Sequence, residues 1–290
     1  MLPVLIAFWM TTPGATGAHQ DGVQQYKAHK YTEAIAAFET AVKDEKPDTP
    51  EYRESVLLIG QSYFMLGQAT AAIPWLEKLT SVNEANYMLG FAYLQSGQAQ
   101  PAQAAFARLF GVQPDSASAH LVTAQMLLRA AYEDRALAEA SQAVETDPNL
   151  PGAHFVLAEA ELAKGSPESA IADLTKELTI DPTFAMAWYQ LGDAKVRLRR
   201  WKDAIADVQR SIWLNPDFSG AFILLGRCFY ETGDFSNAEG TLRKALTLEP
   251  ENRPANYYLG RSLIAEGRSQ EGSAILEKLK SAPQLAPASK

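Results

Sequence analysis

The densest group of cationic side chains lies in the stretch KVRLRRWK, which spans eight residues. Its cations are Lys195, Arg197, Arg199, Arg200 and Lys202. Such a cluster can bind a phosphate or an acidic partner through its local positive potential. The alternative, which we favour, is that these cations end a helix, where the negative end of the helix dipole stabilises positive charge.

Histidine and cysteine are the other side chains that could bind a metal or act as nucleophiles. His120 and His154 lie 34 residues apart and Cys228 is the only cysteine, so the sequence offers no grouped ligands. We therefore interpret both histidines as packing residues and Cys228 as a small core hydrophobe. Neither a glycine-rich phosphate loop nor a nucleophile elbow occurs. The sequence predicts no metal site, no cofactor, no small-molecule substrate and no catalytic activity.

The overall composition favours a helical protein with a large core. Hydrophobic residues make up 47% of the 290 residues, and the formal net charge is -8. Because a nucleic-acid surface must be basic, we expect no nucleic-acid partner. The abundance of Ala and Leu favours helices over strands.

The N-terminal segment 1–18 resembles a secretory signal peptide. An apolar run from Leu2 to Met10 precedes small residues that end at Ala18, although no Lys or Arg stands before the run. We expect an exported protein, periplasmic or secreted. The alternative is a retained segment and a cytoplasmic or membrane-anchored protein, and membrane association is expected only in that case. The run is shorter than the ~20 residues that a spanning helix needs.

A repeat of 34 residues positions all of these side chains. Prolines recur without a gap at that interval, at Pro114, Pro148, Pro182, Pro216 and Pro250. Small residues and mid-repeat glycines recur at the same interval, which is typical of a repeat architecture. Apolar residues within each repeat are spaced by three and four, so each repeat predicts two helices. The mid-repeat glycine suits a left-handed helix end, and the late proline stops the second helix.

The repeats AWYQLGDAKVRLRRWKDAIADVQRSIWLNP and AFILLGRCFYETGDFSNAEGTLRKALTLEP resemble the tetratricopeptide repeat (TPR). The first departs from the pattern at Lys195, where Tyr is usual, and at Arg199, where Gly is usual. The resemblance implies an all-α fold, a right-handed superhelical solenoid of stacked antiparallel helix pairs with about eight units, the first one partial. It also implies that the first helices line a concave groove that binds partner proteins.

We assign residues 19–282 to the array and 283–290 to a disordered tail. The predicted repeats are 19–48, 53–82, 83–116, 117–150, 151–184, 185–218, 219–252 and 253–282. The second repeat is shifted by about one helical turn and should be irregular, with Pro74 near the start of its second helix. The tryptophans at 75, 188, 201 and 213 follow packing positions and are expected in or near the core.

The first helix of each repeat should direct its fifth, ninth and twelfth residues into the groove. The fifth-place residues are Leu57, Tyr87, Leu121, Phe155, Tyr189, Ile223 and Tyr257. The twelfth-place residues are Phe64, Leu94, Leu128, Leu162, Val196, Tyr230 and Ile264. This apolar and aromatic ladder suits an extended peptide or an amphipathic helix. The alternative, equally supported, is packing between adjacent repeats.

The ninth-place residues change from neutral to acidic to basic along the chain. They are Gln61, Phe91, Gln125, Glu159, Asp193, Arg227 and Arg261. A partner with complementary charges would be held in register. The favoured alternative is ion pairing at four-residue spacing within helices, Asp193 with Arg197 and Arg227 with Glu231.

The sequence therefore predicts a non-catalytic protein–protein interaction scaffold that binds a peptide segment or helix of a partner in its groove. The alternative is an accessory TPR subunit of an enzyme or envelope assembly complex whose catalysis lies on another chain. Family members that grip a C-terminal carboxylate use groove Lys and Asn residues. The corresponding places here hold no such pair, which disfavours binding of chaperone tails.

Overall fold

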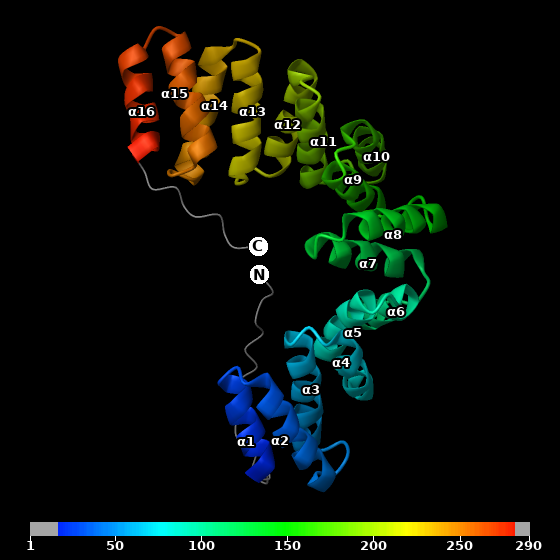
Figure 1. The fold of residues 1–290 in the computed structure, drawn as a ribbon. Coiled ribbons are helices and arrows are strands. Elements are labelled where there is room, and N and C mark those ends of the chain that lie inside the picture. The colour runs from blue at the N-terminus through cyan, green and yellow to red at the C-terminus, as the bar shows by residue number, and fades with distance from the viewer. Residues whose placement is uncertain (1–16, 282–290) are drawn as a thin grey trace. The chain divides into compact units, whose positions relative to one another are not determined.

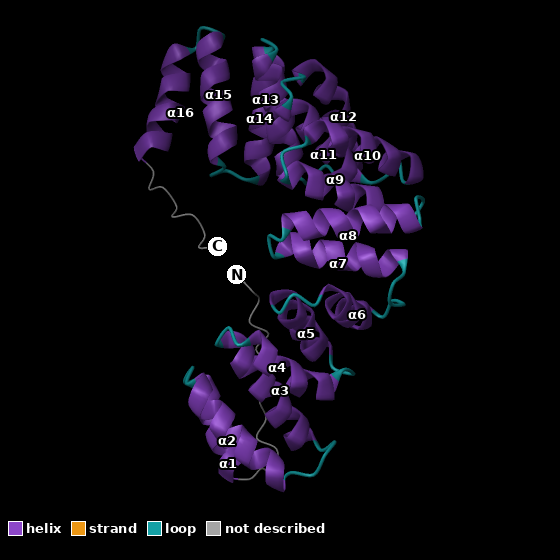
Figure 2. Cartoon of the chain, turned by 45° about the vertical axis from the view of Figure 1, so that its right-hand side comes forward, coloured by secondary structure: helices purple, strands orange, loops and turns teal. Residues whose placement is uncertain are grey.

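The computed structural model describes residues 17–281, which form sixteen α-helices and one short 3₁₀ helix, with no strand in that range (Figures 1 and 2). Two compact halves divide at residues 132 and 133, between the helices of predicted repeat 117–150. Nearly all of the predicted signal segment and the predicted tail 283–290 lie outside the described residues.

The N-terminal half stacks its helices in chain order, each packed against the next. Its elements are α1 (Gly17–Lys27), α2 (Tyr31–Asp44), α3 (Pro50–Met65), α4 (Ala69–Leu76), η1 (Glu77–Leu79), α5 (Asn83–Gln95), α6 (Ala99–Phe110) and α7 (Ala117–Arg129). The expected irregularity is confirmed, because α4 is short and continues as the 3₁₀ helix η1. The position predicted for Pro74 is wrong: it lies inside α4, near the end of that helix.

The C-terminal half continues the same pairing (Figure 1). Its helices are α8 (Glu133–Thr146), α9 (Ala153–Ala163), α10 (Pro167–Ile180), α11 (Ala185–Arg197), α12 (Trp201–Leu214), α13 (Ser219–Glu231), α14 (Phe235–Leu248), α15 (Arg253–Ala265) and α16 (Ser269–Ser281). The backbone of α13 approaches both α11 and α15, whereas the second helices α12 and α14 show no comparable approach to each other. The first helices α11, α13 and α15 therefore form the inner layer of this half.

The recurrent proline ends the second helix, as predicted. Helix α10 stops at Ile180, two residues before Pro182. The intervening Asp181 is part of a turn, because its carboxylate accepts hydrogen bonds from the backbone N–H (2.8 Å) and hydroxyl (2.6 Å) of Thr183. These bonds lower the pKa of the Asp181 carboxyl. Asp181 and Pro182 thus set the boundary between repeats.

The fourth residue of a repeat fixes the connection from the preceding repeat. In three repeats its side chain donates to the carbonyl of the linker proline: Trp188 to Pro182 (2.9 Å), His154 to Pro148 (3.2 Å) and Asn256 to Pro250 (3.2 Å). His154 is also buried, with Nδ1 2.8 Å from Asp173. The interpretation of His154 as a packing residue is confirmed.

The turns between paired helices contain a residue in the left-handed region. Gly165 and Gly233 have φ of 76° and 82°, which confirms the role predicted for the mid-repeat glycine. Arg199 and Ala131 occupy the same place in their repeats with φ of 59° each. A side chain in this conformation is strained by ~1 kcal/mol or more.

Close packing within several of the helix pairs depends on a glycine in the first helix. A Cβ on Gly226 would lie 2.5 Å from Leu242, and one on Gly192 would lie 2.4 Å from Val208. Cys228 is fully buried beside this contact, as predicted, and burial raises the pKa of its thiol to about 12. The expectation for Trp213 is wrong: 69% of it is exposed, and the guanidinium carbon of Arg210 lies 4.2 Å from its ring centroid.

Candidate binding surface

A hollow of about 250 Å³ lies on the inner layer of the C-terminal half. Helices α11, α13 and α15 supply its lining residues, Tyr189, Asp193, Gly220, Ile223, Leu224, Arg227, Pro254 and Tyr258. Four of the predicted groove residues therefore meet here, namely Tyr189, Asp193, Ile223 and Arg227. Sequence reasoning missed Tyr258, although it follows the groove residue Tyr257 directly and lies one turn before Arg261.

Arg227 is the cation of this hollow. Its guanidinium carbon lies 5.1 Å from the ring centroid of Trp201 and 5.8 Å from that of Tyr258. Its Nε is buried without a hydrogen-bond partner. The ion pair predicted with Glu231 does not form, and no carboxylate of residues 17–281 replaces it. Arg227 is instead held by the faces of two aromatic rings.

Asp193 has the opposite environment. Arg197 Nε donates to its carboxylate at 2.8 Å, so this predicted helix pair is confirmed. Arg197 also donates through Nη1 to the carbonyl of Leu162 at 3.1 Å, which ties α11 to the end of α9. The negative charge of Asp193 is therefore neutralised within the chain.

Aromatic and aliphatic groups form the wall between these charges. Tyr189 is half-buried, and its ring meets Phe218 edge-on at 4.9 Å. Burial, with the nearby Asp193 carboxylate, raises the pKa of the Tyr189 phenol. Ile223 is half-buried on the facing turn of α13. The hollow can therefore accept an apolar side chain beside a cation.

On α15 the groove residues are more exposed. Tyr257 is 45% exposed and Ile264 is 36% exposed. Arg261 donates from Nε to the Tyr230 hydroxyl at 3.2 Å, and its guanidinium carbon lies 6.0 Å from the Tyr257 ring centroid. No carboxylate of the described residues pairs with Arg261.

The remaining predicted groove residues differ in their surroundings. Leu57, Tyr87, Leu121 and Gln125 are half-buried on α3, α5 and α7 of the N-terminal half, and Glu159 is half-buried on α9 of the C-terminal half. Phe91 is only 7% exposed, with its ring 5.3 Å from that of Phe106. Phe155 is 9% exposed, with its ring 4.6 Å from that of Phe184. Phe91 and Phe155 are therefore core residues, and the ring contact of each lies within its own predicted repeat and not between adjacent repeats. Groove contact stays a prediction for the others.

Most of the basic cluster is paired inside the chain. Lys195 donates to Asp207 at 2.5 Å and Arg200 to Asp203 at 2.9 Å, while Arg197 pairs with Asp193. Lys195 and Arg197 lie in the last turn of α11, as the favoured alternative predicts. Arg200 and Lys202 instead lie at the start of α12, where the helix dipole does not favour positive charge, so the interpretation is wrong for these two residues. Arg199 and Lys202 are exposed, and binding of an anionic partner there stays a prediction.

One half-buried carboxyl group on α9 has a buried oxygen that lacks a partner. Glu161 occupies the place of Lys195 one repeat earlier, and it faces Asp173, the equivalent of Asp207. Its Oε2 is buried and has no hydrogen-bond partner. Burial, reinforced by the Asp173 charge and opposed by Lys176, raises the pKa of Glu161 to about 7.

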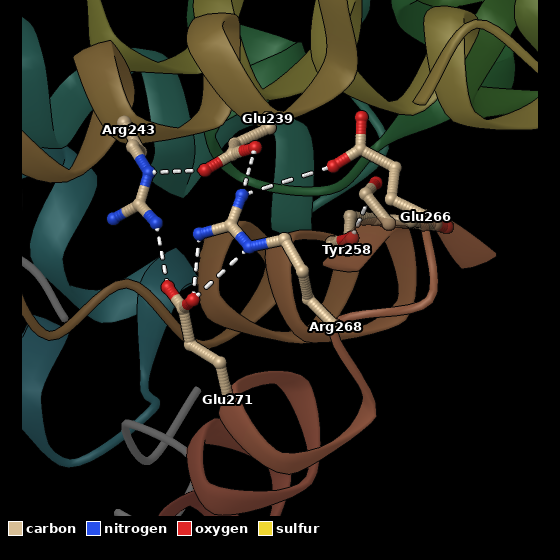
Figure 3. Close-up of polar contacts among 7 residues, drawn as sticks. Glu239, Arg243, Tyr258, Glu266, Arg268 and Glu271 are labelled. Carbon is tan, nitrogen blue, oxygen red and sulfur yellow. Dashed lines mark hydrogen bonds and ion pairs between the residues drawn. The ribbon is translucent and has the colours of Figure 1, made fainter. Parts of the chain in front are cut away.

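An ion-pair network fixes the last helix pair to the preceding one (Figure 3). Arg243 on α14 binds Glu239 and Glu271 at 2.8 Å each, and Arg268 binds the same two carboxylates at 2.6 Å each. Glu266 lies at 3.9 Å from Arg268. Hydrogen bonds from the two arginines lower the pKa values of Glu239 and Glu271. This network keeps α15 and its groove residues in a fixed position.

Residues 17–281 contain neither a cluster of metal ligands nor a helix that could span a membrane. No group of three or more His, Cys, Asp or Glu side chains is arranged to hold a metal ion there. His120 lies 3.2 Å from the Gln103 amide through Nδ1. Over the same range, no helix combines the length and the apolar character that crossing a bilayer requires.

Comparisons with known proteins agree with this architecture. A tetratricopeptide repeat family model matches residues 22–85, 87–151, 134–183 and 189–253, and a second model of the same description matches 229–288. No curated protein matches the chain.

Among solved structures, the MamA protein aligns with a TM-score of 0.54 at 23% identity, covering 60% of this chain and 100% of its own. MamA residues 41 to the end from Desulfovibrio magneticus RS-1 gives a TM-score of 0.54 at 20% identity, covering 57% and 94%. YrrB, described as a TPR protein with an unusual peptide-binding site, gives 0.54 at 22% identity, covering 61% and 92%. At these identities the likeness concerns the fold.

Proposed function

The chain belongs to the tetratricopeptide repeat family, and we propose that it is a non-catalytic scaffold that binds a segment of a partner protein on the inner layer of its first helices. The observation that carries the proposal is the hollow between α11, α13 and α15, where an unpaired cation stands beside half-buried aromatic and aliphatic side chains. The peptide-binding site named for YrrB, which shares the fold, supports the same class of ligand.

Rigid stacking is the physical basis of binding in this proposal. The contacts of Gly192 and Gly226 with the second helices, together with the arginine network on α14 and α16, hold the groove residues before the partner arrives. A preorganised receptor loses little conformational freedom on binding, so most of the contact energy contributes to affinity. Apolar anchors would supply the energy, and the groove charges would set the register.

Site-specific crosslinking tests the proposal directly. A photoreactive amino acid replaces Ile223 in the hollow or, as a control, Lys244, which is exposed on the second helix α14. The full chain is irradiated in extract of the native organism. We expect a protein adduct at position 223, none at 244, and loss of the adduct when Tyr189→Ala and Tyr257→Ala are added. Equal adducts at both positions, or none at 223, would contradict binding at this surface.

We also propose that residues 1–18 direct export, periplasmic or secreted. The support is the apolar run followed by small residues. The mass of the chain purified from its native organism tests this proposal. A chain that begins at or near His19 is expected, and a chain that retains Met1 would contradict cleavage.

A further inference from the structure

We propose that the segment bound by this surface is acidic, with two carboxylates three residues apart that pair with Arg227 and Arg261. This inference rests on the proposed function and adds the chemistry of the partner. Both arginines stand at the ninth place of adjacent first helices, α13 and α15. Neither has a carboxylate partner among residues 17–281.

Arg227 is the stronger of the two sites because it is partly removed from water. Its Nε is buried without an acceptor, and the faces of Trp201 and Tyr258 lie 5.1 Å and 5.8 Å from its guanidinium carbon. A buried donor that lacks an acceptor destabilises the free protein. Arg227 as a whole is half-buried and lines the hollow, so a carboxylate there would form charge-assisted hydrogen bonds with its planar guanidinium group.

The charges around the hollow favour an anion over a cation. Asp193 on the opposite wall is neutralised by Arg197 at 2.8 Å. Glu231 is exposed one turn further along α13 and makes no ion pair with Arg227. Arg227 and Arg261 outnumber this single free carboxylate, so the α13–α15 surface carries an excess of positive charge, although the whole chain has a formal net charge of -8. This local potential would attract an acidic segment and repel a basic one.

The spacing of the carboxylates follows from the stacking of the helices. Packed helices lie ~8–10 Å apart. The backbones of α13 and α15 approach each other, so we expect equivalent residues on these helices to be separated by about that distance. An extended chain advances ~3.3 Å per residue, so three residues span the two arginines. The hollow beside Arg227, walled by Tyr189 and Ile223, would receive a bulky apolar side chain next to the first carboxylate.

Binding of synthetic peptides to the full chain tests this inference. The probe is a fluorescein-labelled ten-residue peptide with blocked ends, two glutamates separated by two residues, and a leucine beside the first glutamate. The comparison peptides replace both glutamates by glutamine or make them adjacent. Fluorescence anisotropy should show that the spaced diglutamate peptide binds about tenfold or more tightly than either, because charge-assisted hydrogen bonds are lost in the others. Its affinity should fall as sodium chloride is raised.

The matched variants are Arg227→Gln, Arg261→Gln and Arg210→Gln. Arg210 also packs on a tryptophan ring, at 4.2 Å from Trp213, but it lies on the second helix α12. We expect Arg227→Gln to weaken the diglutamate peptide about tenfold, Arg261→Gln to weaken it less, and Arg210→Gln to leave it unchanged. Circular dichroism confirms that each variant is folded. Because Arg261 is exposed, its variant gives a second measurement if Arg227→Gln unfolds.

The outcomes separate this inference from the proposed function. Equal affinity for the glutamate and glutamine peptides, with crosslinking of both to position 223, would overturn the acidic preference and leave groove binding intact. Equal loss of affinity in the Arg210 variant would also overturn it, because the effect would then reflect net charge. Failure of every peptide to crosslink at position 223, together with the absence of a native adduct there, would overturn both.

Discussion

The buried carboxyl of Glu161 should make the chain less stable as the pH rises, and Glu161→Gln should remove that dependence. The folded chain binds the Glu161 proton more tightly than the unfolded chain, because burial and the Asp173 charge raise the pKa of the carboxyl from 4.5 to about 7. Stability contributed by the protonated form is complete below pH ~4.5 and is lost as the pH rises through ~7.

The magnitude follows from that shift. At 1.36 kcal/mol for each pH unit, the rise from 4.5 to about 7 corresponds to ~3 kcal/mol. Water reaches part of the side chain, so screening lowers the expected loss to ~1–2 kcal/mol. Glutamine imitates the protonated acid, and Glu161→Gln should therefore be more stable than the natural chain by that amount at pH 8 and equal to it at pH 4.

Urea denaturation followed by circular dichroism at 222 nm, at pH 4, 6 and 8, measures this difference. Glu168→Gln is the matched control, because Glu168 is exposed in the first turn of α10. A second variant, Glu161→Lys, recreates opposite Asp173 the pair that Lys195 and Asp207 form in the next repeat. It should also gain stability at pH 8. The same pH dependence in Glu161→Gln as in the natural chain would refute the reasoning.

Four further predictions concern the backbone and the packing of the repeats. Arg199→Gly should raise stability by ~0.5–1 kcal/mol, because the residue has φ of 59°; a lower melting temperature would contradict this. Gly226→Ala should destabilise by ~1–3 kcal/mol, because the added Cβ would lie 2.5 Å from a leucine on α14. Gly240→Ala, where a Cβ meets nothing within 4 Å, should instead stabilise by ~0.5–1 kcal/mol in the same thermal denaturation series. Cys228, fully buried with a thiol pKa raised to about 12, should react with iodoacetamide only after unfolding, as mass spectrometry at increasing urea would show.

The repeat period made most of the fold predictable, since a proline or glycine at a fixed place dictates where a helix ends. The same period placed Tyr189, Asp193, Ile223 and Arg227 on successive first helices, where the structure brings them around one hollow. The full groove was less predictable. Phe91 has the same place in its repeat as Arg227, yet it packs into the core because Phe106 offers an aromatic partner.

Side-chain pairing depends on neighbours that sequence spacing does not specify. Asp193 and Arg197 have the same four-residue spacing as Arg227 and Glu231, but only the first pair forms. Arg197 gains a second acceptor at the carbonyl of Leu162, whereas the guanidinium of Arg227 lies between aromatic rings. Ring contact and ion pairing compete for one flexible side chain, and their difference is ~1 kcal/mol or less.

The exposure of Trp213 could have been predicted from the residues at the same place in the neighbouring repeats. The residues 34 positions before and after it are Thr179 and Thr247, and both are exposed. Polar residues at the same position of two repeats indicate that this position faces solvent, even where a third repeat has a hydrophobic residue such as Trp213. The comparison between repeats was therefore a better guide than the residue type alone.

Equivalent places in this array hold chemically different residues without a change of fold. The eleventh place is Glu161 in one repeat and Lys195 in the next, and the ninth place is acidic at Asp193 and basic at Arg227. Repeat proteins permit this because each pair of helices contacts only its neighbours, so a charge change in one repeat leaves distant contacts intact. Selection on binding can then act on the ninth place of each repeat separately. The array forms equally well around Asp193 at this place, so the packing of the repeats does not require an arginine without a carboxylate partner in two consecutive repeats, whereas the proposed acidic segment would use both.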